Sequence, residues 1–255
     1  MAAGLIVRLA IALLLAAPGL AKAPAPVLAP IPAAALLIRE ATPVHQWRWR
    51  VAPEAATQPA LLKAMRGAAL ADAATAARAA ARDAASARKA GYPFRRYETI
   101  SDWSLAADTP QLLALAGEIY SFTGGAHGNT GYAVTIWDKA ARRSIAIAAL
   151  FTDWPRARQL IEPGFCAALA DAQRARRGTQ PGAGDFDACP KLSEQVIVPY
   201  AGLATTARQV RVLVGPYVAG PYAEGSYIIT LPWPESVQPF VKPQYRPALF
   251  ANANN

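Results

Sequence analysis

Residues 59–90 form a long alanine-rich stretch that constrains the fold more than any other part of the chain. Alanine has the highest helix propensity, so a helix over these residues costs little free energy to form. Pro59 suits the first turn of such a helix, and Gly91 suits the position just beyond its end. The first half of the predicted helix has an apolar face, whereas the second half offers mostly alanine. The second half therefore packs closely within the monomer or presents an interaction surface.

Short segments with strand character surround this helix. "VHQWRWRVA", residues 44–52, alternates large and polar residues with period two, as a strand does. Segments rich in β-branched and aromatic residues follow over 92–151, separated by turn signals, which predicts an antiparallel meander. A second helical region, 153–177, is expected to break near Pro163, and further strand-like segments come after it. This order predicts an α+β fold of two small lobes, each with an antiparallel sheet packed against a helix.

The N-terminus has the pattern of a secretory signal peptide. Arg8 precedes an apolar run that ends before Pro18, and small residues suit cleavage after Ala21. A membrane anchor is the alternative, but the run is shorter than the roughly 20 residues that a spanning helix needs. We therefore expect a periplasmic or secreted protein without a stable membrane anchor.

The segment boundaries follow from these patterns. A Pro/Ala-rich stretch after the cleavage point is typical of an extended linker, and the C-terminal "ANANN" is typical of a disordered tail. The predicted order is a signal peptide at 1–21, a linker at 22–42, an N-terminal α+β domain at 43–150, a C-terminal α+β domain at 151–245 and a disordered tail at 246–255.

Cys166 and Cys189 are the two cysteines of the chain. In an oxidising compartment an isolated pair is most simply a disulfide. It would close a Gly/Pro-rich loop and stabilise the fold by roughly 3 kcal/mol. Two free buried thiols are the alternative. In neither case is a cysteine a good candidate nucleophile.

The formal net charge of the chain is +9, and removal of the signal peptide with Arg8 leaves +8. Positive charge raises the affinity for anionic partners, which outside the cytoplasm include glycans, wall polymers and lipid headgroups. The arginines are spread along the chain without a nucleic-acid motif, so we expect no nucleic-acid partner. A solvated basic surface is the simpler explanation of the charge.

The sequence "TGGAHGN" lies between two predicted strands. Gly124, Gly125 and Gly128 can adopt positive φ without steric cost, and Asn129 tolerates positive φ better than most residues. Such a turn exposes backbone N–H groups that can bind an anion or a polar ligand. His127 has three readings here: a side chain that hydrogen-bonds its own hairpin turn, a binding residue, or a catalytic base.

Familiar catalytic patterns do not occur in the sequence. His45, His127 and the cysteines lack zinc-site spacing, and no H-E-x-x-H element is present, so we expect no metal and no cofactor. "EGSYI" around Ser226 lacks the G-x-S-x-G elbow of a nucleophilic serine. Paired carboxylates need no motif. Four acidic residues therefore stay candidates: Glu118, Asp138, Asp153 and Glu224.

Two segments together resemble a bacterial extracytoplasmic family. They are "YSFTGGAHGNTGYAVTIWD", followed by the strand "IAIAALF" and a helix, and "VLVGPYVAGPYAEGSYIITLPW" nearer the C-terminus. The family occurs as the N-terminal region of the PdaC-type peptidoglycan deacetylase and in the RsiV-like ectodomain of lysozyme-sensing anti-sigma factors. The resemblance covers the chain from about Val44 to Val241. It implies a PdaC-like α+β domain at 43–150 and an RsiV-like α+β domain at 151–245.

The resemblance does not imply catalysis, because the deacetylase activity belongs to a separate metal-binding domain that we do not expect here. The anti-sigma ectodomains bind lysozyme, but lysozymes of that type are strongly basic. A net charge of +8 opposes that association unless an acidic patch offsets it, so lysozyme is not the expected partner. We expect a non-enzymatic binding module of the cell envelope, whose ligand is peptidoglycan, another glycan or an envelope protein.

The expected ligand face combines the glycine-rich turn with the loop from Tyr217 to Gly225. The candidate binding residues are Gly124, Gly125, His127, Asn129, Tyr217 and Tyr222. The alternative hypothesis is a cell-wall hydrolase or deacetylase in which His127 acts as a general base with a nearby carboxylate.

Overall fold

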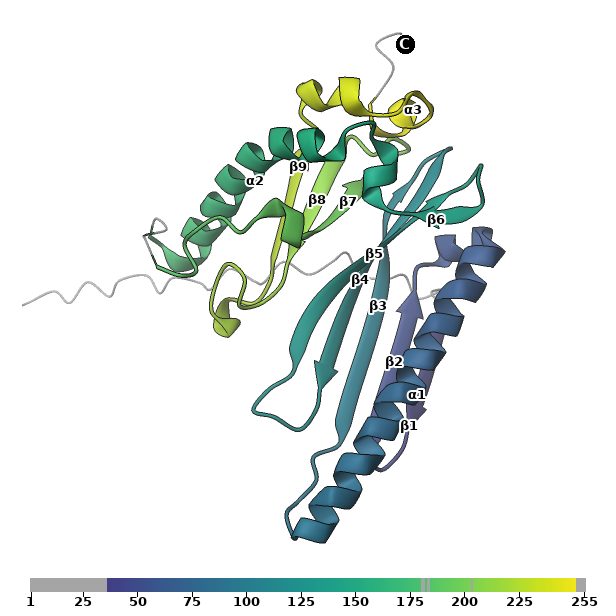
Figure 1. The fold of residues 1–255 in the computed structure, drawn as a ribbon, viewed down its shortest axis with the longest axis vertical. Helices are drawn as coiled ribbons and strands as arrows, with labels where there is room; N and C mark the ends of the chain where they lie inside the picture. Colours follow the sequence, from purple (N-terminus) through teal and green to yellow (C-terminus); the bar gives the residue numbers. More distant parts are fainter. Residues whose placement is uncertain (1–35, 180–181, 183, 203, 251–255) are drawn as a thin grey trace, which may run out of the picture.

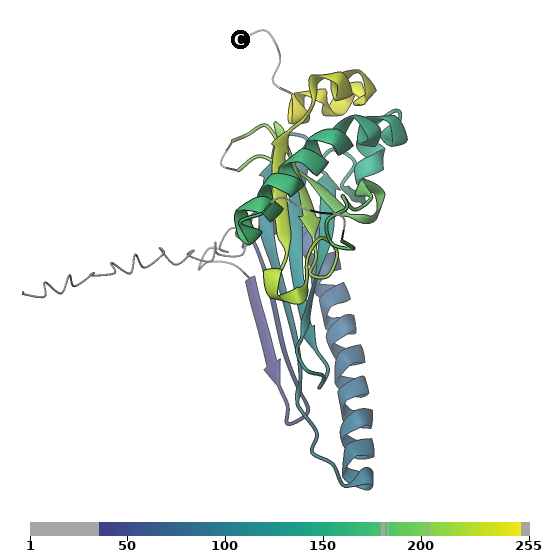
Figure 2. The same cartoon turned by 90° about the vertical axis from the view of Figure 1, so that its left-hand side faces the viewer.

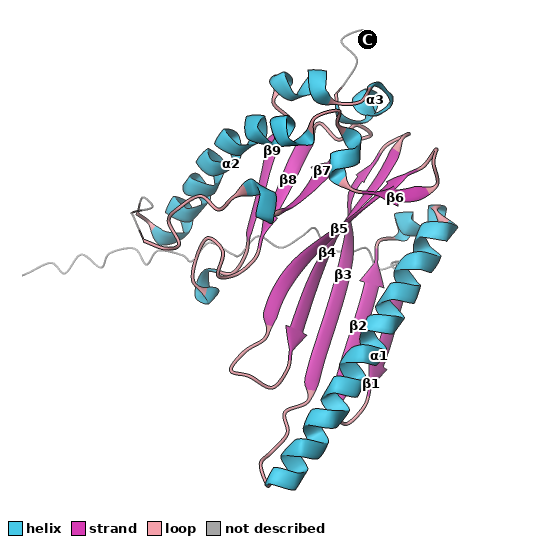
Figure 3. Cartoon of the chain, in the orientation of Figure 1, coloured by secondary structure: helices cyan, strands magenta, loops and turns pink. Residues whose placement is uncertain are grey.

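The computed structural model describes residues 36–179, 182, 184–202 and 204–250. The fold is α+β, as the sequence predicts, with one six-stranded and one three-stranded sheet (Figure 3). The large sheet has the order β1 (Leu36–Ala41), β2 (His45–Val51), β3 (Tyr97–Asp108), β4 (Leu112–Phe122), β5 (Asn129–Asp138) and β6 (Arg143–Ile145). The small sheet has the order β7 (Val196–Tyr200), β8 (Gln209–Val214) and β9 (Tyr227–Pro232).

Helix α1 (Pro59–Ala90) runs along one face of the large sheet (Figure 1). It starts with Pro59 and ends at Gly91, whose φ is 75°, as predicted. The helix connects β2 to β3, which pair in parallel, whereas the other neighbouring strands of this sheet pair antiparallel. The expectation of a purely antiparallel sheet is corrected at this pair. The reason is that a crossover helix returns the chain to the end of the sheet at which β2 began.

Helix α2 (Trp154–Arg177) and the small sheet cover the opposite face of the large sheet at its upper end (Figures 1 and 2). The predicted break in α2 does not occur. The helix continues through Pro163. Buried apolar residues before and after the proline form one packed face, which compensates for the hydrogen bond that proline cannot donate. Gly164 approaches β9 so closely that a Cβ would lie 3.2 Å from Leu231 Cδ1.

Two predicted boundaries are also corrected. Residues 36–41, expected in the linker, form β1, and Ile38 packs against the core beneath α1. Helix α3 (Arg246–Leu249) lies in the segment expected to be a disordered tail, and Leu249 is fully buried there. In both cases apolar side chains pack against parts of the core that are distant in the sequence, which local patterns do not reveal. The predicted signal peptide and residues 22–35 lie outside the described residues.

Strand β4 belongs to both hydrophobic cores. Leu113 and Leu115 pack with the core beneath α1, whereas Leu112, Ala114 and Ala116 pack with the core formed by α2 and the small sheet. Because successive side chains of a strand point to opposite faces, one strand serves two layers. The two halves of the chain therefore share a wall.

The predicted disulfide is present. Cys166 and Cys189 are joined with an S–S distance of 2.03 Å, so the alternative of two free thiols is wrong. The bridge ties α2 to the segment that leads into β7. In the part of the chain that the structure describes, no helix is long and apolar enough to cross a membrane.

Because β4 belongs to both cores, we predict that a cavity in either core destabilises the whole molecule. Leu112→Ala and Leu113→Ala should each lower the free energy of unfolding by about 2–5 kcal/mol, because both side chains are fully buried. Each variant should still show one cooperative transition in denaturant, followed by fluorescence and circular dichroism. Leu37→Ala, at a side chain that is 43% exposed, is the control. Separate transitions for the two halves would contradict the shared wall.

Candidate functional site

The glycine-rich turn joins β4 to β5, with Ser121 opposite Asn129 in the register. Of the residues expected to suit positive φ, only Gly124 has it, at 89°. Gly128 is needed for space instead: a Cβ there would lie 2.3 Å from the ring of Tyr120. Gly125 has open space around it, and Asn129 is simply the first residue of β5. The turn therefore folds back over Tyr120, on the side of the sheet away from α1.

The loop between β8 and β9 contains the second predicted part of the ligand face, from Tyr217 to Gly225. It contains the short 3₁₀ turn η4 (Tyr222–Glu224) and a left-handed tyrosine, Tyr217, with φ of 66°. A non-glycine residue in this region costs about 1–3 kcal/mol and persists only where the surroundings hold it. The surroundings here include two arginines at the end of α2.

Arg177 and Arg176 fix the position of this loop. Arg177 donates from Nε and Nη2 to the two carboxylate oxygens of Glu224, at 2.9 and 3.0 Å, and from Nη1 to Asp187 at 2.5 Å. Arg176 donates to the backbone carbonyls of Glu224 and Ser226, at 2.7 and 2.6 Å. Asp187 lies within the loop that the disulfide closes. The end of α2, the disulfide loop and the β8–β9 loop are therefore tied into one unit.

These contacts lower the pKa of the Glu224 carboxyl group. Burial alone would raise the pKa of Glu224, but hydrogen bonds from Arg177 and Tyr227 and the positive charge of both arginines outweigh burial. The pKa of Glu224 therefore lies below its ordinary value of 4.5. The ionised carboxylate is the form that stabilises the folded loop.

An aromatic cluster forms where the two loops meet, and it consists of His127, Tyr217 and Tyr222. The rings of His127 and Tyr222 are stacked, with centroids 3.8 Å apart and an interplanar angle of 21°. The Tyr217 ring lies 5.6 Å from Tyr222 and 6.1 Å from His127, between centroids. Tyr217 is 49% exposed, and His127 is also exposed. The structure thus brings His127 together with two candidate tyrosines that lie 90 or more positions later in the sequence.

Both ring nitrogens of His127 have partners. The Gly128 carbonyl oxygen can only accept, so Nδ1 carries a proton and donates to it at 2.8 Å. In the neutral ring, Nε2 then accepts from the Tyr217 hydroxyl at 3.1 Å. No carboxylate is hydrogen-bonded to this ring among the described residues. These two bonds hold the imidazole ring in a fixed orientation.

The other histidine lies elsewhere. His45 is buried on the α1 side of the sheet, where Nε2 lies 3.2 Å from Thr99 Oγ1. Burial lowers the pKa of His45 and outweighs the opposing charge of Glu40. Across residues 36–250, gaps aside, no group of three or more His, Cys, Asp or Glu side chains could hold a metal ion.

The four candidate acids differ in their hydrogen-bond partners. Asp153 caps α2 by accepting from the Arg156 N–H, and Asp138 accepts from the Tyr245 hydroxyl. Glu224 is bound by Arg177, as described above. Only Glu118 lacks a hydrogen-bond donor among the described residues. Burial, followed by the negative charge of Asp102, raises the pKa of Glu118.

Two rows of side chains cross the open face of the large sheet, which is the lower part of the face opposite α1. The carboxylate row is Arg50, Asp102, Glu118 and Tyr132, which are neighbours in register on β2 to β5. At the β5 end of this row, Tyr132 packs against the core formed by α2 and the small sheet. The arginine–tyrosine row is Arg39, Arg48, Ile100 and Tyr120, on β1 to β4. Sequence reasoning missed both rows. The alternation in "HQWRWRV" was the available signal, because it places both arginines opposite the tryptophans.

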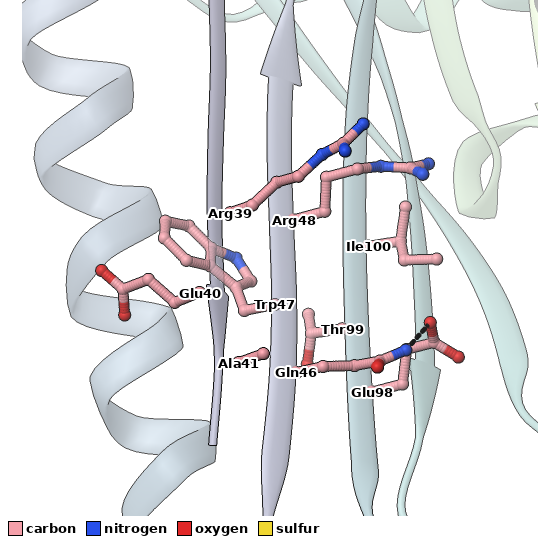
Figure 4. A pocket seen from close by; sticks show the side chains of 9 residues that line it. All are labelled: Arg39, Glu40, Ala41, Gln46, Trp47, Arg48, Glu98, Thr99 and Ile100. Atoms are coloured by element: carbon pink, nitrogen blue, oxygen red, sulfur yellow. Dashed lines mark hydrogen bonds between the residues drawn. The ribbon is translucent and has the colours of Figure 1, made fainter.

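A groove of about 410 Å³ lies at the β1 end of the arginine–tyrosine row (Figure 4). Figure 4 shows Arg39 and Arg48 extending on the same side of the sheet, away from α1, with Gln46 and Glu98 further along the strands. Asp102 accepts from Arg48 Nη2 at 2.8 Å and from Arg50 Nη2 at 3.0 Å. One carboxylate therefore serves two arginines.

One of the comparisons with known proteins, the match to a family model, agrees with the predicted resemblance. Residues 52–130 match the family model described as Deacetylase PdaC, and over this stretch the resemblance is confirmed. Among solved structures, the chain is similar to a DUF3298 family protein from Pseudomonas aeruginosa PAO1, with 17% identity, a TM-score of 0.48 and coverage of 84% of this chain and 96% of that one. A DUF3298 family member from Bacteroides fragilis NCTC 9343 has 13% identity, a TM-score of 0.46 and coverage of 83% and 93%. Among curated proteins, no sequence match is found.

The contact between Gly128 and Tyr120 predicts a specific sensitivity in the turn. Gly128→Ala should lower the free energy of unfolding by about 1–3 kcal/mol, because the new methyl group overlaps the Tyr120 ring. It should also displace His127 from Tyr222, seen as a change in the His127 ring signals in NMR spectra. Gly125→Ala is the matched control: its Cβ would meet its nearest neighbour at 4.0 Å, and it should leave both readouts almost unchanged. Equal effects of the two variants would contradict this account of the turn.

The Arg177–Glu224 pair predicts a pH dependence of stability. A carboxylate with a lowered pKa stabilises the fold above pH 4.5, and this contribution is lost as the pH falls through the folded-state pKa. Arg177→Gln should cost about 3 kcal/mol at pH 7, because the two side chains are only 17% and 18% exposed. The variant should then lose less stability than the parent protein on acidification below pH 4.5.

Urea unfolding at a series of pH values measures both effects. Lys191→Gln removes an exposed ion pair with Glu194, at 78% and 63% exposure, and should change little at any pH. A pH profile of Arg177→Gln that parallels the parent protein would show that the pair does not tune Glu224.

Proposed function

We propose, from the premise that residues 52–130 are a PdaC-type segment, that this chain is a non-enzymatic binding module of the bacterial cell envelope. The module binds a glycan at the aromatic cluster of His127, Tyr217 and Tyr222, and peptidoglycan is the leading candidate. Bacterial glycans of this kind lie outside the cytoplasm. The disulfide between Cys166 and Cys189 supports the same compartment, because disulfides persist in oxidising environments.

The observation that carries the proposal is the aromatic cluster itself. Tyrosine and histidine rings present a flat apolar face together with a polar tip, which suits ligands that combine apolar and hydroxyl-bearing surfaces. His127 and Tyr217 are exposed and Tyr222 is half-buried. The rings are oriented by two hydrogen bonds on His127 and by the arginine contacts behind the loop. Preorganised side chains lose less entropy when a ligand binds. An exposed aromatic group that is held in place in this way supports a binding role.

The hydrolase or deacetylase alternative gains less support. It needs His127 to act with a nearby carboxylate, whereas the ring contacts are a backbone carbonyl and a tyrosine hydroxyl. The matched family model is named after a deacetylase. A match over residues 52–130 supports the family resemblance, but it does not by itself support the deacetylase activity. An envelope protein is the other ligand class, and the binding experiment below separates it from a glycan.

Removal of one ring tests the proposal. Tyr222→Ala should weaken retention of the purified protein on insoluble peptidoglycan about fivefold, since stacked aromatic contacts contribute of the order of 1 kcal/mol beyond their buried area. Tyr92→Ala, at a tyrosine that is 56% exposed and outside the cluster, is the matched control and should bind like the parent protein. Retention is measured by sedimentation over a range of peptidoglycan concentrations.

The same preparation tests the alternatives. Absence of retention of the parent protein on peptidoglycan, together with crosslinking to an envelope protein, would replace the glycan by a protein ligand. Release of muropeptides or of acetate that is abolished by His127→Ala would establish an enzyme and overturn the proposal.

A further inference from the structure

The groove beside Arg39 and Arg48 has an unusual balance of charge. The two arginines are directly opposite each other in the antiparallel β1–β2 pair. Like charges in this position destabilise a sheet, and natural sheets favour opposite charges there. Glu40 does not relieve the repulsion, because it points to the other side of the sheet with Trp47 (Figure 4). Of these two arginines only Arg48 has an ion-pair partner, Asp102, so no direct contact among the described residues offsets the charge of Arg39.

The hydrogen-bonding capacity of these two arginines is also underused. Arg39 is exposed and forms no hydrogen bond or ion pair within the described ranges. Arg48 uses only Nη2, toward Asp102, and its buried Nε has no acceptor among the described residues. Asp102 is itself shared with Arg50, which takes both of its oxygens. Two guanidinium groups with free donors thus line one groove, and a guanidinium fork matches a carboxylate.

The groove is connected to the aromatic cluster by the arginine–tyrosine row. Arg48 is next to Ile100 in register, Ile100 is next to Tyr120, and Tyr120 supports the turn at Gly128 that carries His127. From β1 to β4 there are three strand intervals of about 4.8 Å, so the row spans roughly 14 Å. A ligand that touches both ends must be extended.

We infer that the open face binds a linear glycan that carries carboxylate groups, with one carboxylate held by Arg39 and Arg48 and the chain running along the row to the aromatic cluster. The inference rests on the proposed glycan-binding function and adds the charge, the site of the charged group and the length of the ligand. Glu98, Asp102 and Glu118 lie on the same face. They can accept hydrogen bonds from sugar hydroxyls, but they would repel a polymer with a phosphate at every repeat, so the occupant is a sparsely charged glycan.

The test compares two oligosaccharide series of matched length. One alternates N-acetylglucosamine with N-acetylmuramic acid, whose lactyl group is a carboxylate, and the other is N-acetylglucosamine alone. Isothermal titration with the full protein should show tighter binding of the acidic series, a strong gain from two to six sugar units, and weaker binding at high salt. Equal affinity for the two series, or no gain with length, would overturn the inference.

Variants locate the charged contact. Arg39→Gln should lower the affinity for the acidic hexamer about tenfold and leave the neutral hexamer unchanged, because only the charge-assisted contact is lost. Arg48→Gln and Arg50→Gln form a matched pair: each removes one partner of Asp102, but only Arg48 lines the groove. Arg48→Gln should therefore weaken acidic-glycan binding, and Arg50→Gln should not. Thermal unfolding of each variant checks that the fold is kept.

The outcomes separate this inference from the proposed function. If Tyr222→Ala weakens both series while Arg39→Gln and Arg48→Gln have no effect, the aromatic cluster binds glycan and the carboxylate site is wrong. If the parent protein binds neither series, both the proposed function and the inference fail. Tighter binding of polyphosphate than of the acidic hexamer would also contradict a carboxylated glycan as the occupant.

Discussion

The burial of β4 on both faces is the constraint on which the rest of the structure depends. Its leucines and alanines alternate between the core beneath α1 and the core beneath α2 and the small sheet. The first half of β4 is buried on both faces and carries no charged side chain. Its charged and tyrosine side chains begin only at Glu118, where the strand is no longer fully buried. The same strand therefore provides a packed wall at one end and an open polar face at the other. The boundary between the two positions the candidate site.

The aromatic cluster lies at this boundary because the C-terminal loop reaches past the covered part of the sheet. Its position is set from behind, by the two arginines at the end of α2 and by the disulfide that closes the segment containing Asp187. The turn that meets it is set from below, by the close approach of Gly128 to Tyr120. Neither loop alone would orient His127. The site is a property of the contact between the two halves of the chain.

Net charge describes this protein poorly, because the arrangement of the charges matters more than their sum. Arg176 and Arg177 form hydrogen bonds that hold the β8–β9 loop, and Arg50 shares Asp102 with Arg48. Arg39 and Arg48 instead face each other across a strand pair without a carboxylate between them. That local imbalance, and not the formal charge of +9, is the basis of the inferred contact with a carboxylate.

The sequence by itself determined the helix over 59–90, the strand at "HQWRWRV", the glycine-rich hairpin and the pairing of Cys166 with Cys189. These features follow from local propensity, period-two alternation, turn chemistry and the small number of cysteines, which require no knowledge of distant contacts. The tertiary structure alone decided that β2 and β3 are parallel, that α2 continues through Pro163, and that Arg39, Arg48, Ile100 and Tyr120 form one row. Each of these depends on which segments pack or pair across long separations in the sequence, and pairing register between strands is not encoded in any local pattern.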